Sequence, residues 1–476
     1  MPPSPAYRPS TRHAGLGDAL FDVVAPAEFP SLTLRHRNQA WAARVGLDTL
    51  DATEWLEHFG RFAPLPGSFE APLALRYHGH QFRNYNPDLG DGRGFLFAQL
   101  HDAQDDRLLD LGTKGSGTTP WSRAGDGRLT LKGGVREVLA TTMLEAQGVN
   151  TSKSFSLIET GEQLHRGDEP SPTRSSVLVR LNHSHIRIGS FQRLSYLRDT
   201  ENLQRLLDYS IRTYMPDIWS DDLPTRAAAF LSEVAGRVAR TGAGWMAAGF
   251  VHGVLNTDNI NITGESFDYG PWRFLPTYDP GFTAAYFDHS GLYAYGRQPE
   301  TLLWNLARLG GCLLAFAEKE ALEAALVPFW NTLHGQFAAA MVRRLGLQSG
   351  GPDADADLAR AFCSFLGESQ APFEQAFFDW FQGLASADRA ANSPSAAFYQ
   401  HESFAPVRTA LEGFGANPAL SLDHRYFAHR VPATLLFDDV EALWAPIAAD
   451  DDWSAFADKL AGIAEMADAY GNALGN

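Results

Sequence analysis

Hydrophobic and polar residues follow two different rhythms along this chain, and the change comes near residue 197. From about 74 to 195, short apolar runs are separated by glycine-rich turns, a pattern typical of β-strands. A polar segment, 101–107, joins two of these runs as a hairpin loop. The expected strands are 95–100, 108–111 and 177–181. The first half of the chain is therefore predicted to be rich in strands.

One helix interrupts this half, and helices dominate the second. Between 132 and 147, apolar residues have the 3–4 spacing of an amphipathic face, and Gly148 supplies a C-terminal stop. The stretch 251–268 breaks the later helical pattern, and within it Asn259–Ile262 alternates like a strand. The helical periodicity of the second half covers 201–214, 224–247, 300–327, 330–345, 357–366 and 452–473.

Composition narrows the class of protein. The 476 residues suffice for two or three units with their own cores. A net charge of −17 argues against nucleic acid or an anionic membrane as the main partner, because both require a basic face. Two cysteines indicate a reducing compartment and no disulfide framework. No apolar run approaches about 18 residues and no signal segment begins the chain, so we expect a cytoplasmic protein.

The segment from His252 to Asn259 has the spacing of a protein-kinase catalytic loop, and Asp268-Tyr-Gly270 follows like the magnesium-binding Asp-Phe-Gly. Val254 stands where a kinase carries its catalytic Asp. Because valine cannot accept a proton, the metal half of the kinase site is kept and the base half is lost. An extra carboxylate, Asp258, directly precedes Asn259.

The order of elements agrees with that motif. A strand-rich part with one helix, followed by a helical part with a metal loop, is the α+β, two-lobed architecture of protein kinases. We expect four regions: an N-terminal extension packed on the first lobe, 1–70; a strand-rich N-lobe that binds nucleotide phosphates, 71–197; a helical C-lobe, 198–440, with the catalytic and metal loop at 251–270; and a C-terminal helical extension, 441–476.

Oxygen donors in the second lobe predict a metal site. Asp258, Asn259 and Asp268 carry the hard ligands that Mg²⁺ or Mn²⁺ prefers. Asn-Thr-Asp-Asn alone is also a turn sequence, because Asn and Asp favour turns. The spacing from His252 to Asn259 and Asp268 matches the kinase motif and therefore favours the metal site. His252 itself is expected to brace the loop.

Two Gly-Asp-Gly-Arg tetrapeptides, 90–93 and 125–128, lie in the first lobe. Glycine lets backbone N–H groups approach a phosphate, and arginine adds a charged, forked contact. Either tetrapeptide alone is equally a tight hairpin turn, for which Asp-Gly is a common signal. Their repetition in one lobe favours phosphate binding.

Four charged residues complete the predicted site. Lys114 ends a strand and Glu137 follows 23 residues later on the expected helix, which matches the order of the kinase Lys–Glu pair. Arg180 lies inside an apolar strand, where an unpaired guanidinium is costly to bury, and Arg187 follows it. A structural salt bridge and a phosphate ligand explain Arg180 equally well.

At this point the chain resembles the selenoprotein O family, a group of protein adenylyltransferases with a pseudokinase fold. The resemblance covers about Tyr77 to Leu309, roughly half of the chain. It rests on several motifs in the same order: 77–82, 86–93, 114–123, 125–128, 136–137, 184–187, 252–259, 268–271 and 293–299.

The resemblance implies that ATP binds inverted relative to a kinase, so that AMP is transferred to a hydroxyl of a protein substrate. It makes Asp258 the proton acceptor and Asn259 and Asp268 the ligands of Mg²⁺ or Mn²⁺. The implied nucleotide-binding residues are Gly90, Gly92, Arg93, Lys114, Asp126, Gly127, Glu137, Arg180, Arg187 and Asp268. Lys114 is implied to pair with Glu137.

The chain also departs from the family pattern. Lys132-Gly-Gly-Val135 replaces Arg-Ser-Ser-Ile, and Arg83 replaces a glycine after Gly-His-Gln-Phe. No cysteine lies near the C-terminus, which puts cysteine-based redox control in doubt. Three alternatives remain open beside AMP transfer: UMP transfer from UTP by the same site, a kinase, and a catalytically silent nucleotide-binding scaffold.

Overall fold

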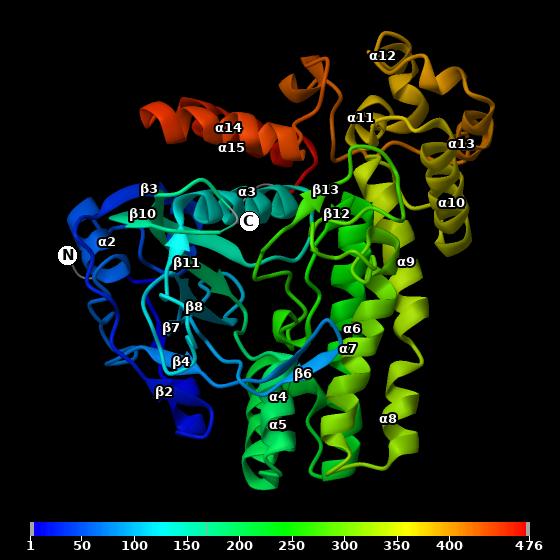
Figure 1. Cartoon of the computed structure of the whole chain (residues 1–476). Helices are drawn as coiled ribbons and strands as arrows, with labels where there is room; N and C mark the ends of the chain where they lie inside the picture. The colour runs from blue at the N-terminus through cyan, green and yellow to red at the C-terminus, as the bar shows by residue number, and fades with distance from the viewer. Residues whose placement is uncertain (1–3, 168, 473–476) are drawn as a thin grey trace.

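The computed structural model describes residues 4–167 and 169–472. It has a strand-rich N-terminal part and a helical C-terminal part, as the two-lobed α+β prediction requires (Figure 1). The strands are β1 Pro9–Ser10, β2 Phe21–Val23, β3 Thr33–Arg37, β4 Leu73–Leu75, β5 Gly79–Gln81, β6 Asn84–Asn86, β7 Leu96–His101, β8 Leu108–Lys114, β9 Leu129–Thr130, β10 Lys153–Leu164, β11 Thr173–Asn182, β12 Phe250–Val251 and β13 Arg273–Phe274.

The helices of the first half are few, and those of the second half are long. Among the described residues they are α1 Gln39–Arg44, α2 Ala52–Phe59, α3 Leu131–Ala146, α4 Ile188–Tyr196, α5 Thr200–Tyr214, α6 Leu223–Ala248, α7 Gln298–Leu313, α8 Lys319–Leu326, α9 Phe329–Arg344, α10 Pro352–Ser369, α11 Phe373–Asp379, α12 Ala387–Ala391, α13 Ala405–Leu411, α14 Phe437–Asp450 and α15 Ser454–Ala469. Residue 473, the last of the expected C-terminal helix, lies outside the described residues.

In the part of the chain that the structure describes, nine strands form one sheet. Its order is β2-β4-β7-β8-β11-β10-β3, with β1 paired to β7 and β9 paired to β11. Residues 1–70, expected to be an extension, thus contribute three strands to this sheet, β1, β2 and β3. Part of the N-terminal segment therefore belongs to the sheet itself and is not merely packed on the surface of the lobe.

Both faces of the sheet are buried, which explains why its strands read as nearly continuous apolar runs. Along β11, Val177 and Val179 pack in one core with Trp55 of α2. Leu178, between them, packs in a second core with Leu139 of α3. Alternate residues of a strand point to opposite faces. Arg180 is consequently expected on the α3 face, where Leu178 lies.

Local signals fix the ends of the main helices. Thr130 caps α3 by accepting a hydrogen bond from Gly133 N at 3.1 Å. Asp222 caps α6 by accepting from Thr225 N at 3.0 Å, and α6 ends at Gly249, whose φ is +65°. Such caps satisfy backbone groups that a helix end leaves unpaired. The expected boundaries of both helices hold to within one residue.

Two expectations from the pattern are wrong. The segment 300–327 contains two helices, α7 and α8, because the chain turns at 314–318, where Phe316 is buried in the core. Asn259–Ile262 is not a strand: Thr257–Asn259 forms a 3₁₀ turn, and Asn261 makes only an isolated bridge with Arg187. The alternation arises because Ile260 and Ile262 are buried in the core.

The C-terminal helices return to the first half of the molecule. In Figure 1, α14 and α15 lie above α3, and α15 packs on α3. Lys132 Nζ of α3 lies 2.8 Å from a carboxylate oxygen of Glu441 on α14. Arg174 of β11 bonds Asp451 at 2.5 Å. These contacts join residues more than 270 positions apart and hold the end of the chain against the sheet.

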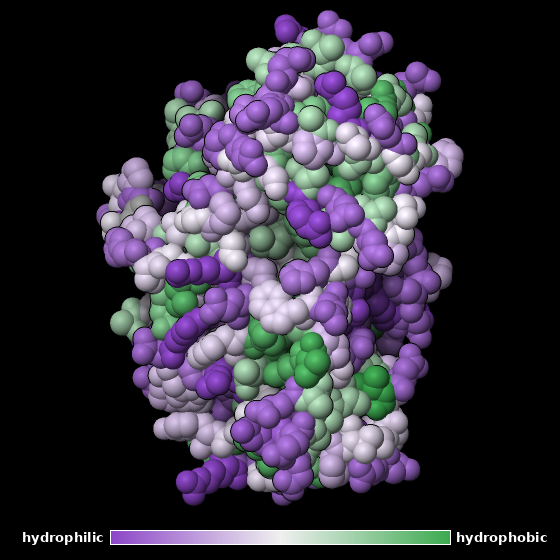
Figure 2. Space-filling view, turned by 90° about the vertical axis from the view of Figure 1, so that its right-hand side faces the viewer, coloured by the Kyte–Doolittle hydropathy of each residue, from purple (hydrophilic) through white to green (hydrophobic). Residues whose placement is uncertain are grey.

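The outer face of the helical part is mixed in character. In Figure 2, hydrophilic residues surround several separate hydrophobic groups. Exposed Leu314, Val327 and Trp330 belong to this part of the molecule. No helix among residues 4–167 and 169–472 is long and apolar enough to cross a membrane.

Candidate active site

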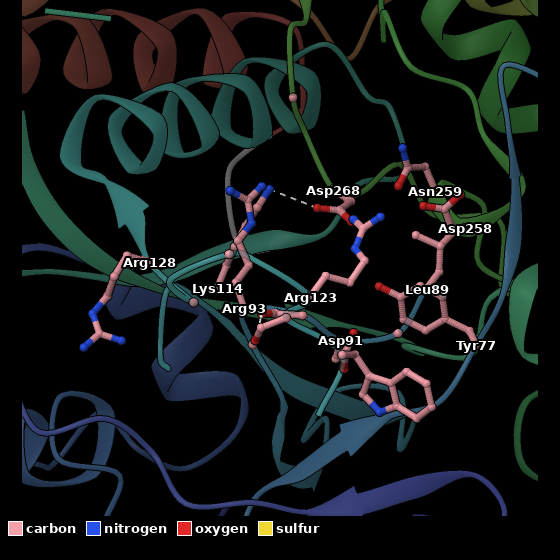
Figure 3. A pocket seen from close by; sticks show the side chains of 18 of the residues that line it. Tyr77, Leu89, Asp91, Arg93, Lys114, Arg123, Arg128, Asp258, Asn259 and Asp268 are labelled. Carbon is pink, nitrogen blue, oxygen red and sulfur yellow. Dashed lines mark hydrogen bonds and ion pairs between the residues drawn. The ribbon is translucent and has the colours of Figure 1, made fainter. Parts of the chain in front are cut away.

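A cavity of about 750 Å³ lies where the strand-rich and helical parts meet. In Figure 3, Asp258 and Asn259 lie on one side of it, and Arg93 and Arg128 lie on the other. Glu137, which pairs with Lys114, is not among the residues that line the cavity. The lining includes every other residue of the predicted site: Gly90, Gly92, Arg93, Lys114, Asp126, Gly127, Arg180, Arg187, Asp258, Asn259 and Asp268.

Lys114 is held by two carboxylates from different parts of the chain. Its Nζ forms an ion pair with Oε1 of Glu137, on α3, and lies 2.9 Å from Oδ1 of Asp268. Lys114 and Glu137 are 5% and 1% exposed. Buried charges of this kind are stable only when they are paired, so removal of one partner leaves the other uncompensated. The predicted Lys–Glu pair is present.

The register of the sheet brings Arg180 beside Lys114. Strands β8 and β11 are antiparallel, with Lys114 opposite Leu178 and Gly112 opposite Arg180. Opposed residues share a face, so both cationic side chains project from the same side of the sheet. This arrangement follows from pairing between strands and not from either strand alone.

Asp268 is the common counter-ion of these cations. Its Oδ1 lies 3.2 Å from Arg180 Nη1, and its Oδ2 lies 3.8 Å from Arg187 Nη1. Although burial opposes ionisation, Lys114 and the two arginines hold the pKa of Asp268 well below its usual range. Asp268 also has a φ of +60°, which is uncommon for a residue other than glycine. The carboxylate is therefore ionised and fixed in direction.

Asp258 has the opposite environment. It is 7% exposed, and its Oδ1 has no hydrogen-bond partner among the described residues. Burial raises its pKa to about 7, against the opposing charge of Arg187. A Cβ placed on Gly79 would come 2.8 Å from this Oδ1, so glycine is required there for space. A carboxylate with a pKa near neutrality suits proton transfer.

His252, which corresponds to the histidine of the kinase loop, has a structural role. His252 is fully buried; its backbone N–H donates to Gln298 Oε1 at 3.0 Å, and its Nε2 lies 3.1 Å from Phe267 O. This agrees with the expected bracing role. Val254 lines the cavity.

Asn259 and Asp268 fit a divalent metal ion. Asn259 Nδ2 donates to Val254 O at 2.8 Å, which leaves the amide oxygen available as a metal ligand. Carboxylate and amide oxygens are the ligands that Mg²⁺ prefers, and this ion usually takes only one or two of them from the protein. No group of three or more His, Cys, Asp or Glu suited to a metal occurs in the described ranges, so a closed cage is absent there.

The two glycine motifs line the same cavity, and packing explains several of their glycines. A Cβ on Gly90 would lie 2.4 Å from the Trp121 ring, and one on Gly92 would lie 2.9 Å from Trp121 O. Gly127 has a φ of +70° and touches Gly117. The loops 89–94 and 115–128 are thus fitted together. The hairpin-turn alternative is wrong for both, because neither tetrapeptide joins two strands paired with each other.

Three features of the site were not foreseen. Asp91, within the first glycine motif, accepts from Arg187 Nη2 at 3.2 Å. Arg166 binds Asp126 at 2.8 Å and adds charge at the rim, although no sequence signal marks it. Tyr77 lies under Arg187, whose guanidinium carbon is 4.2 Å from the ring centroid. The sequence marked Tyr77 only as part of the motif at 77–82, without indicating its contact with Arg187.

The hairpin β5–β6 also belongs to the site. Backbone N–H groups of its first strand and turn donate to the loop 252–259: His80 N to Thr257 Oγ1 at 2.7 Å and Phe82 N to Asn256 Oδ1 at 3.1 Å. Tyr293 OH donates to the same Asn256 oxygen at 2.7 Å. A segment from the first half of the chain thereby supports the loop that carries Asp258.

Comparison with known proteins places the chain in a family. The family model for "Protein adenylyltransferase SelO" matches residues 6–464. This chain belongs to the SelO family. A "Protein nucleotidyltransferase YdiU" of Gloeobacter violaceus is 47% identical, over 95% of this chain and 93% of the relative. The same name is given to relatives in Trichormus variabilis, 43% identical over 96% and 95%, and in Vibrio cholerae, 37% identical over 80% and 76%.

Membership in the SelO family makes the chain a nucleotidyltransferase. One departure from the family pattern has a packing reason: a Cβ on Gly134 would lie 2.4 Å from Leu157, so α3 approaches the sheet closely there. Both cysteines, Cys312 and Cys363, are free, and burial raises the pKa of each thiol to about 12. Neither thiol therefore has the thiolate character that reactive cysteines need.

Proposed function

We propose that this SelO-family chain transfers AMP from ATP to the hydroxyl of a Ser, Thr or Tyr residue in a protein substrate, with Mg²⁺ or Mn²⁺. The observation that carries the proposal is the position of Asp258. It supplies a carboxylate to a cavity in which Val254 occupies the kinase base position. A base displaced in this way matches attack on a different phosphorus of the nucleotide.

The chain's own groups divide into two roles. Asp258 accepts the proton of the acceptor hydroxyl, and the hydroxyl oxygen forms the new bond to the α-phosphorus. The bond between that phosphorus and the bridging oxygen breaks, and pyrophosphate leaves with the electron pair. Lys114, Arg180 and Arg187 hold the leaving phosphates and stabilise the charge that grows on them.

Asn259 and Asp268 would hold the divalent ion, which supplies positive charge to the phosphate oxygens. Asp268 would then share its charge between the metal and the three cations that it contacts. Gly90, Gly92, Arg93, Asp126 and Gly127 are proposed to surround the rest of the nucleotide. The net charge of −17 supports a protein partner and not a nucleic acid or an anionic membrane.

Labelling decides the reaction. With ATP labelled at the α-phosphorus, protein should gain label and an AMP mass, and pyrophosphate should be released. Label arriving from the γ-phosphorus alone would establish a kinase instead. Tight binding of Mg·ATP with no transfer of either label would establish a silent scaffold. Parallel reactions with UTP measure whether UMP transfer competes.

A further inference from the structure

The turn of the β5–β6 hairpin has an unusual backbone. Phe82 and Arg83, its two central residues, have φ values of +48° and +63°. Bulky residues rarely adopt this left-handed conformation, which glycine and asparagine adopt more readily. Strained residues of this kind cluster at functional sites, where surrounding contacts hold them in place. The hydrogen bond from Phe82 N to Asn256 Oδ1 is such a contact.

A second exposed feature adjoins this turn. Tyr286 and Phe287 are 75% and 42% exposed, and their rings lie 5.1 Å apart. Phe287 also lies 5.9 Å from the Phe82 ring. The buried carboxylate of Asp288 accepts from Leu292 N and Tyr293 N, at 2.9 and 2.8 Å, and folds this loop back on itself. The two aromatic rings are therefore presented on a braced loop.

We propose that Phe82, Arg83, Tyr286 and Phe287 form an acceptor rim, a surface that binds an extended segment of the protein substrate. This inference rests on the proposed function and names the chemistry of its acceptor: an apolar side chain and an acidic side chain close to the modified hydroxyl. The apolar side chain contacts the aromatic rings, and the acidic one binds Arg83.

The acceptor rim adjoins the cavity that holds the reacting groups, which supports a segment of the protein substrate as its ligand. Asn256, which binds the hairpin turn, lines the cavity two residues before Asp258. A segment on the acceptor rim consequently lies beside the proposed base. Aromatic rings on a braced loop offer contact area at low cost in conformational entropy, and such anchors dominate binding at interfaces.

Charge supports an acidic residue in the acceptor. Arg83 is half exposed, and its only ion pair in the described ranges is a 3.7 Å contact with exposed Glu300. Exposed pairs of this kind contribute little, so an acceptor carboxylate can replace Glu300. Arg123, at the cavity wall, is exposed as well. Both arginines add positive potential on the acceptor side of an otherwise acidic protein.

The test uses the full chain with Mg·ATP and three tyrosine peptides of equal length: one with flanking Leu and Asp, one with flanking Leu and Lys, and one with glycines only. Wild-type protein should give the highest kcat/KM with the Leu–Asp peptide. Phe287→Ala should lower that kcat/KM about tenfold, as loss of an anchor does. Trp330→Ala, an exposed aromatic residue on α9, is the matched control and should change nothing.

Substitutions of Arg83 test the preference for an acidic acceptor most directly. Arg83→Gly relaxes the backbone, so Tm should rise while the preference for Asp over Lys disappears. Arg83→Glu should reverse that preference, and Glu300→Gln should strengthen it. Unchanged preferences in all three variants, with Mg·ATP binding intact, would overturn the acceptor rim.

The outcomes separate this inference from the proposed function. If pyrophosphate is released and proteins gain α-label while no peptide does, the acceptor rim is overturned and AMP transfer stands. If only a second copy of the chain is labelled and the Arg83 variants label it equally well, the rim is again overturned. If no acceptor of any kind gains label, the function itself fails.

Discussion

Asp258 and Asp268 lie in the same cavity with the pKa values of their carboxyl groups displaced in opposite directions. Burial raises the pKa of Asp258 to about 7, whereas Lys114, Arg180 and Arg187 hold that of Asp268 well below its usual range. Two acidic groups in contrasting environments are a common way for one site to obtain a base and a charged ligand.

Asp258→Asn should separate chemistry from binding. The amide cannot accept the hydroxyl proton, so the rate of AMP transfer should fall by about 10² to 10⁴. Calorimetry should show Mg·ATP binding close to that of wild type, because Asp258 is not among the proposed metal ligands. A variant that retains most of the wild-type rate would exclude Asp258 as the base.

Asp268→Asn should change nucleotide binding differently with and without metal. The substitution removes the counter-ion of three cations, so ATP in the presence of a metal chelator should bind more tightly than to wild type. With Mg²⁺, binding should weaken because a metal ligand is lost. Calorimetry under both conditions measures this. Asp357→Asn, which removes an exposed carboxylate on α10 outside the cavity, is the control; an equal response would contradict the central role of Asp268.

Lys114 and Glu137 should act as a unit. Either alanine substitution should remove most activity, and the double variant should be little worse, because groups in contact are not additive. Transfer rates for the four proteins of the double-mutant cycle give the coupling. Fully additive losses would mean that the pair makes no joint contribution to the reaction.

Gly90→Ala should displace the loop 119–128. The added Cβ would lie 2.4 Å from the Trp121 ring, which is closer than real Cβ contacts come. We expect weaker ATP binding and a lower Tm, with partial recovery in Gly90→Ala/Trp121→Leu. Gly270→Ala is the control: Gly270 lines the same cavity, but nothing lies within 4 Å of a Cβ placed on it. The Tm of this variant should match that of wild type. If ATP binding and Tm are no better in the double variant than in Gly90→Ala, the proposed contact between residue 90 and Trp121 would be contradicted.

Glu265→Gln should stabilise the protein at alkaline pH. Burial raises the pKa of Glu265 from 4.5 to about 7, so the folded state binds a proton more tightly than the unfolded state, and stability is lost as pH rises between these values. The amide removes this loss and still accepts from His183 N. Urea unfolding should show a gain of up to about 3 kcal/mol near pH 8 that shrinks towards pH 4.5.

The exposed Glu323→Gln on α8 provides the matched control, with no pH-dependent difference between pH 8 and pH 4.5. A gain for Glu265→Gln that is the same at both pH values would show that the substitution acts through packing and not through proton binding.

The sequence by itself determined the parts of this protein that depend on local spacing. Helical periodicity predicted α3, α5 and α6 closely, with Gly148 as the stop after α3, since the apolar face of a helix is set by spacing over a few residues. The spacing from His252 to Asp268 predicted that Asn259 and Asp268 belong to one site, and both line the same cavity. The same periodicity missed the break after α7, because burial of Phe316 is decided by distant residues.

Only the tertiary structure decided which charges meet. Strand register brings Arg180 beside Lys114, and the fit between two loops explains Gly90 and Gly92 as packing residues. The pKa of Asp258 depends on burial by segments such as Gly79, almost 180 positions away. The physical reason is the distance along the chain over which each property is set. Periodicity depends on residues that are neighbours in sequence, whereas burial and ion pairing depend on every segment that the fold brings near.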